Sequence, residues 1–198
     1  LWPESPPARL RSSFHVTMHH LRRVLGGADW VTFHEGRYRF ERVEACACDV
    51  EHFELLLGGE RAARSGASPD DVAARMQQLE HALALYRGDF LDDAGFGDWS
   101  LEPRDRLRRR YAAAAIELAS LYHAARRFDD AAETCRRLLA RDNLDERAHH
   151  LLIQSLADAG RPAEALRHHQ VMVALFREEL GIAPSAETAR LVDGIVAA

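Results

Sequence analysis

An internal repeat of 34 residues constrains the fold of this chain more than any other feature of its sequence. A shift by that period places Leu118 on Leu152, Tyr122 on Leu156, Arg126 on Gly160, Phe128 on Pro162, Ala131 on Ala165 and Leu138 on Met172. This period is typical of a helix–turn–helix unit. One pair of helices cannot bury its apolar face alone, so three or more pairs are expected to stack.

Apolar periodicity after residue 45 predicts about seven helices, over residues 49–64, 69–87, 100–125, 129–141, 145–159, 162–180 and 185–197. The repeat length within this region is that of tetratricopeptide repeats, in which a small residue lies where two antiparallel helices approach closely. Ala131 and Ala165 occupy such positions, and Cys135 is predicted to be a core residue. A generic helical bundle is the alternative interpretation.

Turn and cap residues support these ranges. Helix starts are predicted from Ser68-Pro69-Asp70-Asp71, from Asp129 and Asp145 as N-caps, and from Ser185 with Thr188. Gly160 followed by Pro162 predicts the end of one helix and the beginning of the next.

The first 44 residues have a different pattern, which predicts one helix followed by a β-hairpin. Three prolines exclude a continuous helix over residues 1–8, and Ser12 or Ser13 is predicted to cap a helix that runs to about Leu25. Phe14, Met18, Leu21 and Leu25 form its apolar stripe, and Gly26-Gly27 ends it. Residues 30–33 and 38–40 are two β-prone runs joined by a tight turn over residues 34–37.

A helix followed by a hairpin with a glycine turn is the second half of a winged helix-turn-helix, in which the helix enters the major groove of DNA. Groups that donate hydrogen bonds or carry positive charge stand away from the apolar stripe: Ser12, Ser13, His15, Thr17, His19, His20, Arg22 and Arg23, with Arg37 and Arg39 in the hairpin. Such groups contact base edges and phosphates. The alternative is a solvated polar face on an ordinary helix.

Charge is divided unevenly along the chain. The formal net charge is −5, yet residues 1–42 carry seven arginines and four acids, and the remaining 156 residues carry 19 arginines and 27 acids. The basic segment is therefore where DNA contact is expected, and the acidic helical region is expected to contact protein.

Other classes of function find little support in the residues. The chain has no lysine, which excludes a Walker-type phosphate site, and motifs of zinc proteases and serine hydrolases are absent, so we predict no enzyme activity and no cofactor. His15 and His19 have metal-capable spacing without an evident third ligand, so no metal site is predicted. No membrane segment or signal peptide is expected, and an odd number of cysteines, three, favours a reducing cytoplasm.

Several motifs resemble SARP-type transcriptional regulators. They are Leu1-Trp2-Pro3 with Pro6 and Pro7, the segment 13–26, the segment 36–40, and, for a bacterial transcriptional activator domain, the segments 49–53, 82–91 and 180–188. The sequence of residues 14–23 is also similar to the C-terminal part of large nucleotide-binding (STAND-type) regulators. This similarity implies, as an alternative, an ATPase module upstream of the chain.

The resemblance implies a transcriptional activator of mainly α structure. Residues 1–44 would be the C-terminal part of a winged helix that binds double-stranded DNA, and residues 45–198 a tetratricopeptide-like activator domain. That domain is implied to contact the transcription machinery or another protein, or to form a homodimer. Because the chain has no initiator Met and lacks the first half of a winged helix, we expect a fragment of a longer protein that binds DNA poorly alone.

Two rival functions remain open at this stage. The first is a protein-interaction scaffold whose repeat groove binds a peptide or a regulator without direct DNA contact. The second is a helical enzyme, which would need a convergent pocket of acids and histidines.

Overall fold

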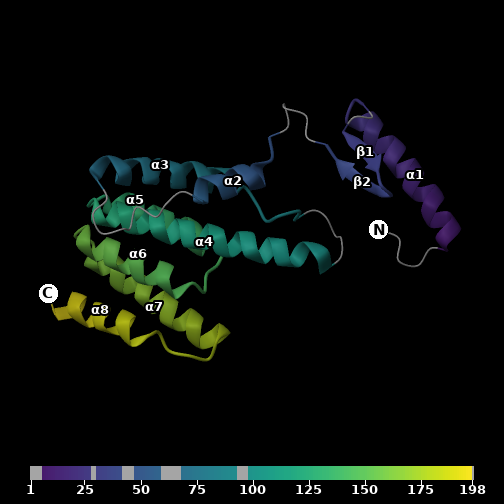
Figure 1. Cartoon of the computed structure of the whole chain (residues 1–198). Helices are drawn as coiled ribbons and strands as arrows, with labels where there is room; N and C mark the ends of the chain where they lie inside the picture. The colour runs from purple at the N-terminus through teal and green to yellow at the C-terminus, as the bar shows by residue number, and fades with distance from the viewer. Residues whose placement is uncertain (1–5, 28–29, 42–46, 59–67, 93–97, 198) are drawn as a thin grey trace. The chain divides into compact units, whose positions relative to one another are not determined.

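The computed structural model describes residues 6–27, 30–41, 47–58, 68–92 and 98–197. These residues are mainly α-helical with one β-hairpin, as the sequence predicts (Figure 1). Contacts divide the chain into two compact units, Leu1–Cys48 and Asp49–Ala198. The first unit contains the helix and the hairpin, and the second contains helices throughout its described part.

Helix α1 (Pro7–Val24) begins earlier than the sequence analysis expected. The prediction that Ser12 or Ser13 caps it is wrong, because Pro6 is the N-cap and Pro7 the first helical residue. Proline is favoured there, since its missing N–H has no intrahelical partner to lose and its φ already suits the helix. The predicted end is confirmed. Gly26 has a φ of +80°, and the Gly27 N–H donates to the Arg22 carbonyl at 3.0 Å.

Strands β1 (Val31–His34) and β2 (Arg37–Phe40) form the predicted antiparallel hairpin. The register places Val31 opposite Phe40 and His34 opposite Arg37, so only Glu35 and Gly36 make the turn. Both turn residues have positive φ, 50° and 78°, as a two-residue type I′ turn requires. Gly36 adopts this conformation without a steric penalty.

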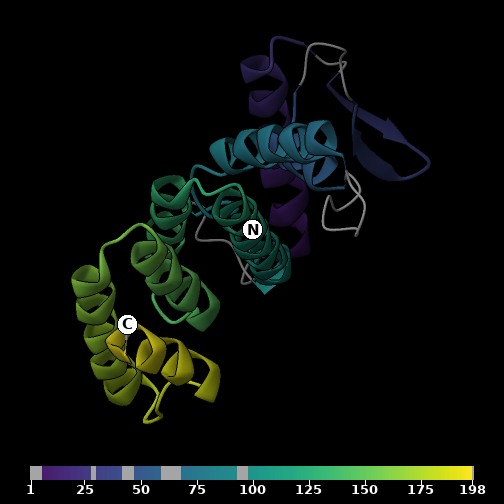
Figure 2. The same ribbon diagram turned by 90° about the vertical axis from the view of Figure 1, so that its left-hand side faces the viewer.

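The second unit contains α2 (Asp49–Leu57), α3 (Pro69–Leu85), α4 (Leu101–Ala124), α5 (Phe128–Leu139), α6 (Glu146–Asp158), α7 (Pro162–Glu179) and α8 (Ala186–Ala197), and a short 3₁₀ turn at Asp98–Ser100 precedes α4. Part of the predicted range 49–64 lies outside the described residues. Each of these helices packs on the next, and α6 also contacts α4 and α8. Figure 2 shows the resulting stack from α3 to α8.

The repeat is visible as equivalent positions in successive pairs. Leu118 and Leu152 are buried, and Ala131 and Ala165 are fully buried where their helices approach the preceding ones. Arg126 and Gly160 both follow the end of a helix with positive φ, 59° and 76°. In each case the next N–H donates to the carbonyl five residues back, Arg127 to Tyr122 and Arg161 to Leu156, which is the 6→1 bond of the Schellman motif. The predicted tetratricopeptide-like stacking is therefore confirmed over α4 to α7.

Predicted caps are confirmed at two helices and wrong at a third. Ser68 and Asp71 form a reciprocal capping box at α3, and the hydrogen bonds from Ser68 lower the pKa of Asp71. The Asp145 side chain accepts from two N–H groups at the start of α6. Asp129 is not a cap, because α5 already begins at Phe128 and Arg127 is its N-cap residue.

The core follows the stack rather than forming one centre. Phe176, Met172 and Ile153 are at most 1% exposed and belong to one cluster that joins α5, α6 and α7. Cys135 lies in the same cluster, which confirms it as a core residue, and burial raises the pKa of its thiol to about 12. No helix within the described residues is long and apolar enough to cross a membrane.

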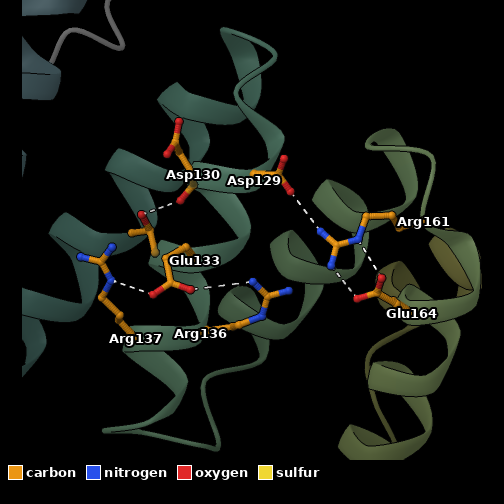
Figure 3. A network of polar contacts seen from close by, with 8 residues as sticks. Asp129, Asp130, Glu133, Arg136, Arg137, Arg161 and Glu164 are labelled. Atoms are coloured by element: carbon orange, nitrogen blue, oxygen red, sulfur yellow. Dashed lines mark hydrogen bonds and ion pairs between the residues drawn. The ribbon is translucent and has the colours of Figure 1, made fainter.

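An ion-pair network links α5 and α7 at their surface (Figure 3). Arg161 donates to Asp129 at 3.0 Å and to both carboxylate oxygens of Glu164, at 2.6 and 2.8 Å. Glu133 accepts from Arg137 on the same helix at 3.2 Å. Water screens exposed ion pairs of this kind, so the apolar core contributes more to the stability of the stack than this network does.

Candidate nucleic-acid interface

Helix α1 is fixed to the hairpin by one aromatic contact and one polar link. The ring of Phe14 meets the ring of Tyr38 edge-on, with centroids 5.0 Å apart. The Arg22 guanidinium donates from Nε and Nη2 to the Val31 carbonyl, at 3.2 and 2.6 Å. Met18 and Val31 are buried. The helix and the hairpin therefore form one unit, in which the orientation of the outer face of the helix relative to the outer face of the hairpin is fixed.

Most of the residues predicted to contact DNA are exposed. Exposed are Ser12, His15, Thr17, His19, His20, Arg23, Arg37 and Arg39, whereas Ser13 and Arg22 are partly buried. Arg22 differs from the others in its contacts, because its guanidinium already binds the β1 backbone. The geometry thus gives Arg22 a structural role and leaves Arg23 as the accessible cation in the last turn of α1.

One face of α1 points directly away from the hairpin. With 3.6 residues per turn, Ser12, His19, His20 and Arg23 lie on the side opposite Phe14 and Met18. His15 lies on one flank of this face, and Thr17 lies near the edge of the apolar side. The predicted set of residues therefore extends around more than one face of the helix, and four of its members lie opposite the apolar side.

Arg9 is a candidate that sequence reasoning missed. It is exposed one turn before Ser12 and lies near the same outward face. The sequence analysis started the helix at Ser12 or Ser13 and so left Arg9 outside it. The signal was Pro7, whose preference for the first helical position extends the helix to include Arg9.

The hairpin carries its arginines on one face. Side chains alternate along a strand, so Arg37 and Arg39 share a face of β2, and Tyr38 and Phe40 share the other. The pairing places Thr32 and His34 next to the arginines on that face. Since Tyr38 contacts Phe14 of α1, Arg37 and Arg39 point away from the helix. Both guanidiniums are exposed.

Charge and hydrogen-bonding groups on this unit suit an anionic partner. Its described residues include six arginines and only two acids, Glu35 and Glu41. Glu41 accepts a hydrogen bond from Thr32 at 2.8 Å, and Glu35 lies at the turn. Within the described ranges no group of three His, Cys, Asp or Glu residues could hold a metal ion.

Comparison with protein families decides what the helical unit is. The profile described as "Bacterial transcriptional activator domain" matches residues 48–196. The chain belongs to this family. The match covers the helix stack from α2 to α8.

Two curated relatives match across both units. Regulatory protein AfsR of Streptomyces griseus is 29% identical over 202 residues, covering 100% of this chain and 20% of the relative. Regulatory protein AfsR of Streptomyces coelicolor is 27% identical over 194 residues, covering 93% and 18%. The chain spans about a fifth of the length of these relatives. Together with the family match, they confirm the resemblance to SARP-type regulators.

A solved structure shares the fold. The Mycobacterium tuberculosis protein EmbR, determined in complex with a low-affinity phosphopeptide, superimposes with a TM-score of 0.77 at 24% sequence identity. The superposition covers 100% of this chain and 52% of EmbR. The order of helix, hairpin and helical stack in this chain is therefore also found in a solved structure.

Proposed function

We propose that this chain is the DNA-contacting and activator part of a transcriptional activator. Residues 1–44 are the C-terminal part of a winged helix-turn-helix, and residues 45–198 are the activator domain. The observation that carries the proposal is the exposed polar and cationic face of α1 beside a hairpin with two outward arginines, in a chain whose helical unit belongs to an activator-domain family.

In the proposed complex α1 lies in the major groove and the hairpin contacts the sugar–phosphate backbone. Ser12, His19 and Arg23 face the base edges and phosphates, with Arg9 and His20 beside them. Arg37 and Arg39 neutralise phosphates, which fixes the orientation of the helix without reading sequence. Arg22 holds the hairpin in place through the Val31 carbonyl.

The helical unit supplies the protein contacts of the proposed activator. It has 26 acids and 19 arginines over residues 49–198, so it repels the DNA backbone and leaves that contact to the first unit. Its partner is the transcription machinery or another regulator, with a homodimer as a further assembly. We place this activity in the cytoplasm and assign no enzymatic step to it.

Salt-dependent DNA binding tests the proposal. The full-length protein is titrated onto a fluorescein-labelled duplex of about 30 base pairs, at several salt concentrations between about 50 and 200 mM. Each arginine that contacts a phosphate contributes about one unit to the slope of log K against log[salt]. Arg23→Ala and Arg37→Ala should each weaken binding and reduce the slope by about one unit.

Arg177→Ala on α7 is the matched control, because Arg177 is exposed and lies in the helical unit. It should leave the slope unchanged. The assignment of the DNA face is wrong if the Arg23 and Arg37 variants keep the wild-type slope, or if the Arg177 variant loses as much. Circular dichroism of each variant confirms that the helices are retained.

A further inference from the structure

The helical unit contains a cleft that the DNA-contacting surface does not use. Its volume is about 850 Å³, and it lies where the end of α3, the N-terminal half of α4 and the loop from α5 to α6 meet. Tyr86 and Tyr111 form part of its wall, and four arginines surround them: Arg108, Arg109, Arg141 and Arg147. We call it the arginine cleft. Its volume is in the range of ligand-binding pockets.

Arg141 is held in a fixed position within the arginine cleft. Its guanidinium carbon lies 5.2 Å from the ring centroids of both Tyr86 and Tyr111. Those two rings contact each other at a tilt of 31°, with centroids 4.6 Å apart. Nη2 of Arg141 donates to the carbonyls of Tyr86 and Arg87, at 3.2 and 3.4 Å. These contacts orient the guanidinium and leave most of its five N–H donors available.

The arginines of the cleft differ in how their charges are neutralised. Arg108 is paired with Asp89 and lowers the pKa of that carboxyl, and Arg147 is paired with Asp145 at 3.1 Å. Arg141 has only backbone carbonyls as hydrogen-bond acceptors, and Arg109 has no polar partner within the described residues. Two guanidiniums therefore remain without a carboxylate, in a unit that is acidic as a whole.

The tyrosines add an apolar wall that stays neutral. Tyr86 donates its hydroxyl hydrogen to Asp89 at 2.8 Å, and burial, followed by this bond, raises the pKa of Tyr86 above its ordinary value. Asp89, Asp142 and Asp145 also line the cleft, and three carboxylates in its wall disfavour the repeated phosphates of a nucleic acid. A ligand with one or two carboxylates fits the cleft better than a nucleic acid does, because each carboxylate can accept two hydrogen bonds from the guanidinium of Arg109 or Arg141.

We propose that the arginine cleft binds an acidic segment of a partner protein, whose Asp or Glu carboxylates pair with Arg109 and Arg141 and whose apolar side chains lie on Tyr86 and Tyr111. The inference rests on the proposed role of the helical unit in protein contact and names the chemistry of that partner. It is independent of DNA contact by α1.

Fluorescence anisotropy with a defined probe tests the inference. The 198-residue chain is titrated onto a labelled peptide that alternates glutamate with tyrosine, and onto a second peptide with glutamine in place of glutamate. A hydrogen bond between charged groups is worth about tenfold in affinity or more. The glutamate peptide should bind more tightly than the glutamine peptide, and Arg109→Gln and Arg141→Gln should each weaken it about tenfold.

Arg177→Gln on α7 is the control of equal charge change outside the cleft, and it should bind the glutamate peptide like the wild type. Arg109→Gln is informative even if Arg141→Gln fails to fold, because no described polar contact depends on Arg109. The inference is overturned if both cleft variants bind like the wild type, or if free glutarate or duplex DNA occupies the cleft as tightly as the peptide.

The two proposals fail separately in these experiments. Arg141→Gln should keep the wild-type salt slope on DNA, and Arg23→Ala should keep the wild-type affinity for the glutamate peptide. If Arg23→Ala and Arg37→Ala keep the wild-type salt slope, only the proposal for the DNA face on α1 and β2 fails. If the glutamate and glutamine peptides bind equally, only the proposal for the arginine cleft fails.

Discussion

At the scale of single residues, His149 and His168 form a hydrogen bond that their positions in the sequence do not indicate. The Nε2 atom of His149 lies 2.8 Å from the Asn143 carbonyl and so carries the hydrogen, which makes Nδ1 the acceptor for Nε2–H of His168 at 2.9 Å. Burial lowers the pKa of both imidazoles, and that of His168 falls to about 4. Both rings are therefore neutral in the folded chain at pH 7.

This pair makes stability depend on pH in a definite direction. Between pH 6.5 and about 4 the unfolded chain binds a proton at His168 that the folded chain does not, so the free energy of unfolding falls as the pH falls through this window. The shift sets an upper bound of about 3 kcal/mol, and because the His168 ring is partly exposed, solvent screening keeps the loss below this bound. Urea unfolding of the wild type and of His168→Gln at pH 7, 5.5 and 4.5 measures it. The variant should lose less stability than the wild type, and equal losses would contradict the prediction.

At the scale of helices, a predicted cap residue marks a helix start only if its side chain accepts hydrogen bonds from the backbone of the first turn. Asp145 was predicted as a cap and is one, because it accepts from the N–H groups of Arg147 and Ala148. Asp129 has the same residue type and a similar apolar neighbour, yet it lies inside the first turn of α5 and pairs with Arg161. Residue type alone did not distinguish the two positions, since α5 starts two residues earlier than a cap at Asp129 would place it.

The two aspartates give a matched pair of variants. Asp145→Ala should lower the free energy of unfolding by about 1 kcal/mol, because two N–H groups at the start of α6 lose their acceptor. Asp129→Ala removes only an exposed ion pair and should change it by less than about 0.5 kcal/mol. Thermal and urea unfolding of both variants compares them. Equal effects would show that the Asp145 side chain does not cap α6.

At the scale of the whole molecule, the second unit is a stack in which each helix depends on its neighbours. Contacts join successive helices, and α6 also contacts α4 and α8. In such an arrangement stability is roughly a sum of the terms from each helix pair and from the interfaces between pairs. A defect in α7 should therefore affect its interfaces with α6 and α8 most strongly.

Phe176 and Val171 on α7 test this distribution. Phe176 is 1% exposed in the cluster between α6 and α7, so Phe176→Ala should cost about 3–5 kcal/mol. Val171 is 62% exposed, and Val171→Ala should change stability by less than about 0.5 kcal/mol. Chemical denaturation followed by circular dichroism measures both. A cost below about 1 kcal/mol for Phe176→Ala would mean that this cluster does not hold the end of the stack.

The amino-acid sequence by itself determined the helix periodicity, the hairpin with its Glu35-Gly36 turn, and the equivalence of Arg126 with Gly160. These features depend on interactions within a few residues, such as backbone hydrogen bonds, φ preferences and the 34-residue apolar pattern. It also placed the predicted DNA-contacting residues in one segment, and the helix start at Pro7 adds Arg9 to the candidate face.

Only the tertiary structure decided the partners of the arginines. Arg75 is buried and binds Glu117, 42 residues away, and the Leu56 carbonyl; Arg22 binds Val31; and Arg141 lies on Tyr86 and Tyr111. In the sequence all of them are equivalent cations on amphipathic helices or their ends. A long side chain reaches whichever acceptor packing brings near, so its role follows from the arrangement of helices and not from its own segment.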